Sequence, residues 1–482
     1  MAENTSYFMR AILPEIMVLV LIGFVLLFDV LWKDERKRNL GWLTFGGLLL
    51  TIVVSCSLAV PEATGYTVWG NMLSFDLAGF LFNMIFLFGA AVTSLLVMDS
   101  EPAGQRGEFY SLMLVSTIGM MLMASSYDLV MLFLAIETTS IPLYILAGFL
   151  YGDNKSTEAG FKYLFFGALT SAIMLYGFSL LYGFGGSTNI YNLSIKMQFG
   201  GMPDAILLGS MLLILVGFAF KTSIVPLHFW APDTYEGAPT AVAGFLSTAS
   251  KAAGFAVLMR VFYTLYSQVG FNWGILIAIL AVFTMTLGNL LAIGQKNIKR
   301  LLAYSSIAHA GYVLVGLVAV SPIGVASVVF YLGIYLVTNL AAFGVAVVFF
   351  RVVGSDDIAA YAGLSRRAPA LGLVMLIAFL SLAGMPPFGG FVAKVWVFTA
   401  ALQQGWLWLV VIGILNSIIG LYYYLRVLNV VYHHRSESEN LPLPVTAPNA
   451  IALALLSIFI ILLGVLFTPF FNISALAGSG WF

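Results

Sequence analysis

Four charged side chains stand inside long apolar stretches of this sequence. Glu137 lies in VMLFLAIETTSIPLYILAGF, Lys221 in LVGFAFKTSIVP, Lys251 in FLSTASKAAGFAV and Lys394 in LAGMPPFGGFVAK. A charge at the centre of a membrane costs about 2.5–3.5 kcal/mol on insertion scales, so four such charges cost on the order of 10 kcal/mol. Because this cost is high, we expect the four groups to face the interior of a helix bundle and to have a function there.

Proton transfer is the chemistry that these residue types support. Burial makes an ammonium group release its proton more readily, and a carboxylate about 4 Å away opposes this by about 4 kcal/mol at an effective dielectric of 20. Moving one charge against roughly 200 mV costs a similar amount, about 4.6 kcal/mol. We hypothesise that Glu137 controls the proton on Lys221. Lys251 then passes the proton on, and Lys394 stores or ejects it.

Histidine is the other side chain that exchanges protons near neutral pH. His228 follows Lys221 in FKTSIVPLHFW, and His309 lies in LLAYSSIAHAGYVLVGL. On a helix, Ser305 and Ser306 would share one side with His309. Two interpretations of His309 stay open: a core histidine that hydrogen-bonds to neighbouring hydroxyls, or a proton relay.

Prolines interrupt two of the apolar stretches that carry the lysines. Pro226 follows Lys221, and Pro386 and Pro387 precede Lys394. Proline breaks the hydrogen-bond ladder of a helix, and irregular backbone within a membrane is tolerated only where protein or water surrounds it. We therefore predict two broken helices, one in each half of the chain, as in transporters that are built from structural repeats.

The composition indicates a membrane protein and excludes several other classes. Of the 482 residues, 61% are hydrophobic and 9% are charged, whereas soluble domains carry about 25% charge. The 21 basic and 21 acidic residues give no net charge for binding nucleic acid. Cys56 is the single cysteine, which excludes an iron–sulfur cluster held by this chain's thiolates and an internal disulfide. The sequence contains no GxxxxGK[ST], HExxH or GxSxG motif.

The apolar stretches predict an all-α polytopic membrane protein with about fourteen transmembrane helices, each of about 20 residues. The predicted spans are 9–31, 40–60, 76–98, 109–126, 128–150, 161–184, 204–225, 239–264, 273–293, 298–319, 323–352, 369–400, 406–432 and 447–469. The acids Glu15 and Asp29 stand near the two ends of the first span, so we expect them to reach the interface.

Basic residues predict the orientation of these spans, because they accumulate in cytoplasmic loops. The loops after odd-numbered spans hold 15 of them: Lys33, Arg36, Lys37, Arg38, Arg106, Lys155, Lys162, Lys296, Lys299, Arg300, Arg351, Arg366, Arg367, Arg426 and Arg435. The opposite side holds Arg10, Lys196 and Arg260. This asymmetry places both termini outside the cytoplasm, and the short loops favour a bacterial inner (plasma) membrane.

Three segments closely resemble one known family. They are FKTSIVPLHFWAPDTYEGAPTAVAGFLSTASKAAG, IKRLLAYSSIAHAGY and LAGMPPFGGFVAKVWVF. They are similar to the antiporter-like membrane subunits of respiratory NADH:quinone oxidoreductase (complex I), over nearly the whole chain. Within that family, the stretch APDTYEGAPT and the short length resemble the N type.

The resemblance implies two inverted five-helix repeats with discontinuous helices 7 and 12. It divides the chain into residues 1–108 with helices 1–3, residues 109–264 and 265–435 with the two repeats, and residues 436–482 with helix 14. It also implies that Glu137, Lys221, Lys251 and Lys394 match the family's proton-translocating positions, with His228 and His309 as further relay candidates.

The resemblance also implies partners and excludes cofactors from this chain. Expected partners are the K-type and M-type membrane subunits, the peripheral redox arm and the lipid bilayer. NADH, FMN, iron–sulfur clusters and quinone are expected in partner subunits. Two alternatives stay open: a stand-alone cation/proton antiporter subunit of the Mrp type, and a scaffold subunit whose buried charges have no function.

Overall fold

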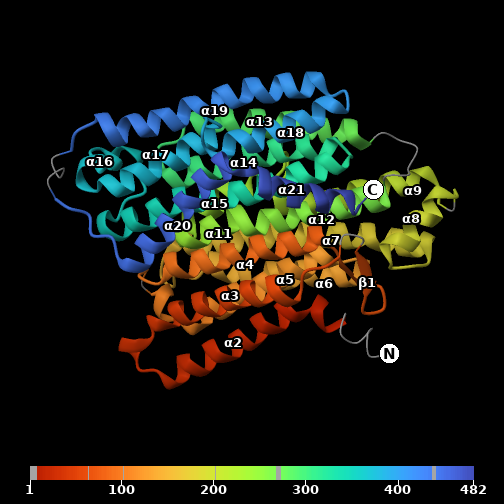
Figure 1. Cartoon of the computed structure of the whole chain (residues 1–482), viewed down its shortest axis with the longest axis horizontal. Coiled ribbons are helices and arrows are strands. Elements are labelled where there is room, and N and C mark those ends of the chain that lie inside the picture. Colours follow the sequence, from red (N-terminus) through yellow and green to blue (C-terminus); the bar gives the residue numbers. More distant parts are fainter. Residues whose placement is uncertain are drawn as a thin grey trace.

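The fold is an elongated bundle of helices that run roughly side by side (Figure 1). The computed structural model describes residues 8–62, 65–100, 102–200, 202–266, 273–436 and 441–481. The helices are α2 (Leu13–Leu31), η1 (Asp34–Arg36), α3 (Asn39–Leu58), α4 (Leu77–Val97), η2 (Ala103–Gln105), α5 (Gly107–Ser125), α6 (Leu129–Ala147), α7 (Asn154–Gly185), α8 (Ile190–Gln198), α9 (Asp204–Thr222), α10 (Trp230–Gly237), α11 (Thr240–Phe245), η3 (Leu246–Ser250), α12 (Lys251–Leu265), α13 (Trp273–Ile293), α14 (Ile298–Val318), α15 (Pro322–Val353), η4 (Ile358–Tyr361), α16 (Leu364–Arg367), α17 (Pro369–Ala383), α18 (Gly389–Gln403), α19 (Leu407–His433), α20 (Ala447–Val465) and α21 (Phe467–Ser479).

The predicted all-α polytopic fold is confirmed. Within the described residues, 13 helical segments are long and apolar enough to cross a membrane, and one of them, Thr240–Leu265, joins α11, η3 and α12. The predicted span 369–400 is instead divided into α17 and α18. The prediction for 161–184 begins too late, because Asp153 caps α7 by accepting from the backbone N of Lys155 at 3.0 Å.

Two broken helices position Lys221 and Lys394, as predicted. The first break separates α9 from α10, and the second separates α17 from α18. Both begin with a residue in the left-handed region, Ser223 with φ 58° and Gly384 with φ 86°.

The two breaks also close with the same backbone hydrogen bond. The N–H of Ile224 donates to the carbonyl of Ala219 at 2.8 Å, and that of Met385 donates to the carbonyl of Leu380 at 2.9 Å. This bond is typical of a helix that ends at a left-handed residue.

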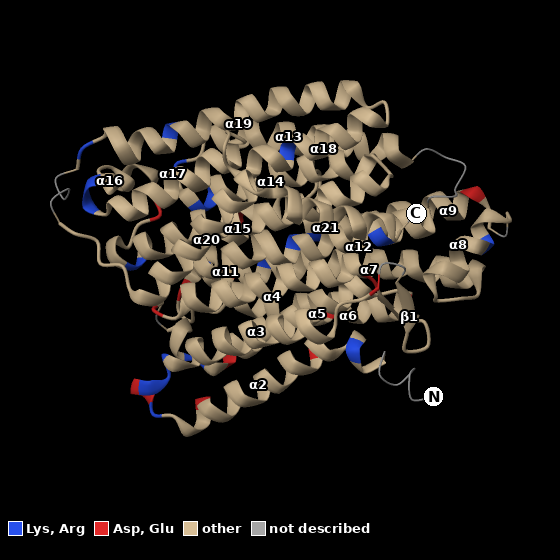
Figure 2. Cartoon of the chain, viewed as in Figure 1, with Lys and Arg blue, Asp and Glu red and all other residues tan. Residues whose placement is uncertain are grey.

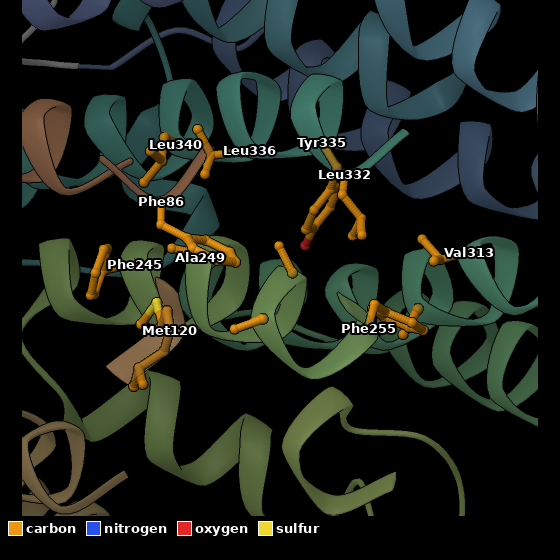
Figure 3. Packing of buried hydrophobic residues seen from close by; sticks show 14 of the residues in the cluster. Phe86, Met120, Phe245, Ala249, Phe255, Val313, Leu332, Tyr335, Leu336 and Leu340 are labelled. Carbon is orange, nitrogen blue, oxygen red and sulfur yellow. The ribbon is translucent and has the colours of Figure 1, made fainter. Parts of the chain in front are cut away.

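Buried hydrophobic residues form one cluster that extends from α2 to α21. Phe86 of α4, Met120 of α5, Phe245 of α11 and Leu336 of α15 all belong to it (Figure 3). A Cβ atom on Gly89 would lie 2.9 Å from Cδ1 of Leu336, so a larger residue at this position would require the Leu336 side chain to move.

A short β-hairpin departs from the purely helical expectation. Strand β1 (Tyr66–Val68) pairs antiparallel with β2 (Leu73–Phe75), and Tyr66 faces Phe75 in the register. It precedes α4, whose first turn is capped by the side chain of Asp76.

Lys and Arg gather at the end of the bundle that carries α16 and the connection from α2 to α3 (Figure 2). Few lie at the other end, where α8 and β1 are found and where α2 begins. Two residues that the sequence analysis placed in loops, Arg260 and Lys299, instead lie inside α12 and α14 and are buried.

Arg260 is buried because it has a buried partner. Its guanidinium binds both carboxylate oxygens of Asp76, at 2.8 and 3.2 Å. Burial alone would raise the pKa of Asp76, but the charge and hydrogen bonds of Arg260 outweigh it and hold that pKa below its ordinary value. Glu15, in the first turn of α2, is likewise buried in the protein: it is 7% exposed and accepts from Asn83 at 3.5 Å.

Candidate functional site

Lys221 lies in the last turn of α9, immediately before the first break, and is 6% exposed. Its Nζ donates to Oγ of Ser140 on α6 at 2.8 Å. Glu137 lies one turn before Ser140 on α6, and its buried Oε1 has no hydrogen-bond partner among the described residues. In this structure the lysine therefore bonds to a serine that is next to the glutamate, and not to the glutamate itself.

Lys251 follows an irregular helical segment. The π-helical residues of η3 end directly before it, and such segments are frequent at functional sites. Lys251 is 2% exposed, and its Nζ donates to Oγ of Ser306 on α14 at 2.6 Å. The same Nζ lies 5.9 Å from the centre of the Tyr235 ring. Like Lys221, this lysine is held by a hydroxyl.

His309 lies one turn beyond Ser306 on α14 and is buried. Its Nδ1 is 2.7 Å from the hydroxyl of Tyr331, and its Nε2 is 3.3 Å from the hydroxyl of Tyr424. Tyr424 also hydrogen-bonds to Ser305. Both ring nitrogens thus contact hydroxyls, which come from α15 and α19. The neighbouring hydroxyls on α14, which one of the two open interpretations named, are not these partners.

Lys394 lies in α18, just beyond the second break, and is 6% exposed. Its Nζ donates to the carbonyls of Leu382 and Ala383, at 3.0 and 2.9 Å, and to Oγ of Ser417 at 2.8 Å. The two carbonyls are at the C-terminal end of α17, where the helix dipole favours a cation. The ammonium also lies 4.9 Å from the centre of the Tyr312 ring.

The helix α14 connects the second and third lysines. Ser306, His309 and Tyr312 are spaced by three residues, so they share one face of α14. This face contacts Lys251 at one end and Lys394 at the other.

Close packing brings α12 against α9 and so connects the first two lysines. A Cβ on Gly254 of α12 would lie 2.8 Å from Thr222 and 3.3 Å from Cγ of Lys221. The structure therefore arranges Glu137, Lys221, Lys251, His309 and Lys394 along one row of neighbouring helices, which we call the buried row.

Small cavities and unpaired polar atoms accompany the buried row. Two cavities of about 10 Å³ each lie beside Lys221 and beside His309, which is about the space that one water molecule needs. Buried polar atoms without a partner among the described residues also lie near it: Oγ of Ser223, the hydroxyls of Tyr235 and Tyr335, and Oδ1 of Asn339.

His228 is placed differently from the other candidates. It is half-buried in the first break, and its Nδ1 lies 3.3 Å from the carbonyl of Pro226 in the same segment. Among the described residues, no hydrogen bond or ion pair joins His228 to the buried row, although the charge of Lys251 acts on its imidazole.

Sequence reasoning missed the hydroxyl partners of the row: Ser140, Ser417, Tyr331 and Tyr424. Ser417 and Tyr331 lie on the next helix of the chain after the group they bind, 23 and 22 residues away. Ser140 and Tyr424 are 81 and 115 residues away from theirs. Serine and tyrosine are common in this chain, and no local pattern distinguishes these four. Their only usable signal is that Ser140 follows Glu137 by one helical turn.

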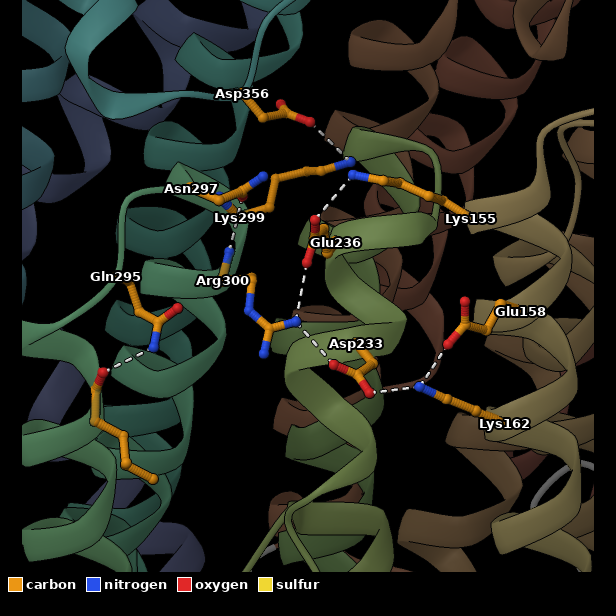
Figure 4. A network of polar contacts seen from close by, with 11 residues as sticks. Lys155, Glu158, Lys162, Asp233, Glu236, Gln295, Asn297, Lys299, Arg300 and Asp356 are labelled. Atoms are coloured by element: carbon orange, nitrogen blue, oxygen red, sulfur yellow. Dashed lines mark hydrogen bonds and ion pairs between the residues drawn. The ribbon is translucent and has the colours of Figure 1, made fainter.

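A second set of charges lies at the basic end of the bundle (Figure 4). Asp233 of α10 binds Lys162 at 2.7 Å and Arg300 at 2.8 Å, and Glu236 binds Arg300 at 2.9 Å. Lys155 of α7 adds a 3.1 Å contact to Glu236. These ion pairs tie α7 and α14 to α10, the short helix that follows the first break.

Known proteins share this arrangement. Residues 126–420 match the family described as "NADH:quinone oxidoreductase/Mrp antiporter, TM". NADH-quinone oxidoreductase subunit N of Moorella thermoacetica is 42% identical over 460 residues, which cover 95% of this chain and 96% of that one. The same subunit of Heliobacterium modesticaldum is 42% identical over 93% of this chain and 94% of its own.

Solved structures agree with these sequence matches. A chain of respiratory complex I from Thermus thermophilus has a TM-score of 0.79 and 32% identity, covering 96% of this chain and 99% of that chain. A chain of the Mrp complex from Dietzia has a TM-score of 0.85 at 21% identity, over 99% of this chain and 97% of that one, and shows the shared fold.

The buried row and the broken helices thus define an antiporter-like membrane subunit. The chain belongs to the NADH:quinone oxidoreductase/Mrp antiporter membrane family and, within it, to the N subunits of NADH-quinone oxidoreductase. It is therefore a subunit of respiratory complex I and works with the other subunits of that complex.

Proposed function

We propose that this chain translocates protons along the buried row, and that quinone reduction elsewhere in complex I drives the movement. The observation that supports this most strongly is the type of partner that each lysine has. Lys221, Lys251 and Lys394 are all 6% exposed or less, and each donates to a serine hydroxyl.

A hydroxyl is a suitable partner for a group that gains and loses a proton. It accepts from an ammonium, and after the proton has left it can donate to the neutral amine. A carboxylate in the same place would favour the ammonium strongly and hold the proton there. The serine partners therefore do not hold the lysines in the charged state as a carboxylate would. Ser140 and Ser417 now donate to the carbonyls of Ile136 and Ala383, so each must turn its hydroxyl to donate to a neutral amine.

Glu137 then acts as the controlling group of the row. Its Oε1 has no partner, and it lies one turn from the serine that Lys221 binds. When the Lys221 ammonium turns from Ser140 to this carboxylate it keeps its proton, and when it returns to the serine it can release it. His309, with hydroxyls at both ring nitrogens, is placed to relay protons between Lys251 and Lys394. His228 is at most an accessory group at the first break.

The position of the chain in the complex follows from the same proposal. The asymmetry of Lys and Arg supports a bacterial plasma membrane location with the basic end in the cytoplasm and both termini outside. K-type and M-type membrane subunits are its neighbours, and the peripheral arm carries NADH, FMN, the iron–sulfur clusters and the quinone site. The alternative of a stand-alone antiporter is disfavoured, because the relatives at 42% identity are N subunits.

Replacement of Lys251 by methionine tests the proposal, because methionine keeps the length of the side chain without the charge. In vesicles that contain the complete complex, Lys251→Met should lower the number of protons translocated per NADH oxidised. The exposed Lys196 offers a matched control, and Lys196→Met should leave that ratio unchanged. An unchanged ratio in Lys251→Met, with normal NADH oxidation, would remove the proposed role.

A further inference from the structure

A cleft of about 780 Å³ opens at the basic end of the bundle. It reaches the residues between α10 and α11 and the start of α14. Its walls contain both acids and bases: Asp99, Asp153, Lys155, Glu236, Lys299, Arg351 and Asp356. The cleft is large enough for many water molecules, and it lies beside the helices that lead to Lys251.

Asp356 differs from the other acids of this cleft. It follows α15, and its Oδ2 lies 3.3 Å from Nζ of Lys299. Its Oδ1 is buried and has no hydrogen-bond partner in the described part of the chain. Burial raises the pKa of the Asp356 carboxyl above its ordinary value, although the Lys299 ammonium acts in the opposite direction. Asp356 therefore has both a free oxygen and an increased tendency to bind a proton.

The groups that face Asp356 come from several elements. Lys299 belongs to α14, Lys155 to α7 and Glu236 to α10. Figure 4 shows the amino groups of Lys155 and Lys299 close together between Glu236 and Asp356. Tyr361 of η4 is the fourth neighbour, and its buried hydroxyl has no partner among the described residues. Glu236 already binds Lys155 and Arg300. Asp99 also has a buried oxygen in no hydrogen bond, but it pairs with Arg38 and Arg351, which hold its pKa below the ordinary value. Asp356 is therefore the acid of this group that combines an unpaired oxygen with a raised pKa.

Polar groups lead from this acid toward the buried row. Lys299 and Ser306 are separated by seven residues, which places them on one face of α14 about 10.5 Å apart. Ser306 is the serine that Lys251 binds.

A second polar pair lies beside the same path. Lys299 also donates to the carbonyl of Ala238, just before α11, at 3.2 Å. Ser247 lies one turn before Lys251, and its Oγ accepts from Nδ2 of Asn339 at 2.7 Å. Oδ1 of Asn339 has no hydrogen-bond partner among the described residues.

We propose that Asp356, held by Lys299, is the group that takes up protons from the aqueous phase at the basic end and delivers them to the buried row at Lys251. This inference rests on the proposed proton translocation. A hydronium ion in the cleft gives its proton to Oδ1 of Asp356 and leaves as water. The neutral acid releases its hold on Lys299 and passes its proton through water to the neutral amine of Lys251. Lys251 becomes an ammonium, and Asp356 becomes a carboxylate again.

The test compares Asp356→Asn with Asp357→Asn in vesicles that contain the complete complex. Asp357 is the matched control, because it is the next residue, is exposed and makes no side-chain cap. We expect Asp356→Asn to lower the rate of proton uptake at the basic end. In the unmodified protein this rate should decrease as the pH rises, by about tenfold per pH unit if one group loads the row. Asp356→Asn should abolish this decrease. Asp357→Asn should behave like the unmodified protein.

Three results separate this inference from the proposed function. If Lys251→Met lowers proton translocation and Asp356→Asn leaves uptake and its pH profile unchanged, the loading role of Asp356 is wrong and the buried row stands. If Lys251→Met has no effect, the proposed function itself fails. Where Asp356→Asn prevents assembly, Asp356→Glu keeps the charge and should shift the midpoint of the pH profile; an unshifted midpoint would overturn the inference.

Discussion

The two broken helices close with the same backbone geometry but use their lysines differently. In the first break, Lys221 precedes the break and makes one hydrogen bond, to Ser140 on another helix. The carbonyl of Phe220 at that helix end accepts instead from the indole of Trp230, at 3.0 Å. In the second break, Lys394 follows the break and makes three hydrogen bonds, two of them to the carbonyls at the helix end.

The difference shows that Lys394 stabilises a helix end, whereas Lys221 does not. Buried helix ends must have their carbonyls satisfied. A neutral indole does this in the first break, so Lys221 is left with a single contact and can change partners. In the second break the charged lysine itself satisfies the carbonyls, so Lys394 has both a structural and a functional role.

The largest expected effect on assembly is that of Lys394→Met. This change removes a charge and leaves the carbonyl of Leu382 without its donor, which costs about 1–3 kcal/mol. The carbonyl of Ala383 keeps a weaker donor, the hydroxyl of Ser417 at 3.3 Å. We expect several-fold less assembled complex, measured on native gels, together with loss of proton translocation. An unchanged amount of complex would show that the ammonium does not support the second break.

Gly384→Ala should have the next largest effect. Residue 384 has φ 86°, and a Cβ there would lie 2.8 Å from Cδ of Lys394 and 3.2 Å from its Nζ. A left-handed conformation costs about 1–2 kcal/mol for a residue with a Cβ. The thermal midpoint of the purified complex should fall. The matched variant in the first break, Ser223→Gly, removes a Cβ from a left-handed residue and should leave the midpoint unchanged or raise it. A fall for Ser223→Gly would contradict the comparison.

Trp230→Phe should have a smaller effect. Phenylalanine keeps a ring beside Tyr163, whose ring stacks on Trp230 at 4.4 Å, but removes the N–H that binds Phe220. The loss of one neutral hydrogen bond costs about 0.5–1.5 kcal/mol. The thermal midpoint should therefore fall less than in Lys394→Met. An equal or larger fall would mean that the two breaks depend equally on their side-chain donors.

Much of this architecture can be predicted from the sequence. The apolar stretches located the spans, and the prolines located both breaks, because these signals act locally along the chain. Charges within apolar stretches indicated burial for the same reason, and Lys221, Lys251 and Lys394 are indeed buried. The repeat boundaries at residues 109, 265 and 436, and the roles of the site residues, stay predictions.

What the sequence could not predict depends on contacts between distant segments. The position of Arg260 in the sequence does not reveal that Asp76 lies beside it, and that of Glu15 does not reveal its contact with Asn83. Likewise, the spacing of Lys221 and Glu137 cannot show that Ser140 takes the position of the expected ion-pair partner.

The most direct test of the account is the ratio of protons translocated to NADH oxidised in the complete complex with Lys221→Met. Lys221 makes one hydrogen bond, and its replacement leaves the backbone hydrogen bonds of the first break intact. The amount and the thermal midpoint of the complex should therefore stay close to those of the unmodified protein. The account predicts a lower ratio in this well-assembled variant. A normal ratio with normal NADH oxidation would contradict the claim that protons travel along the buried row.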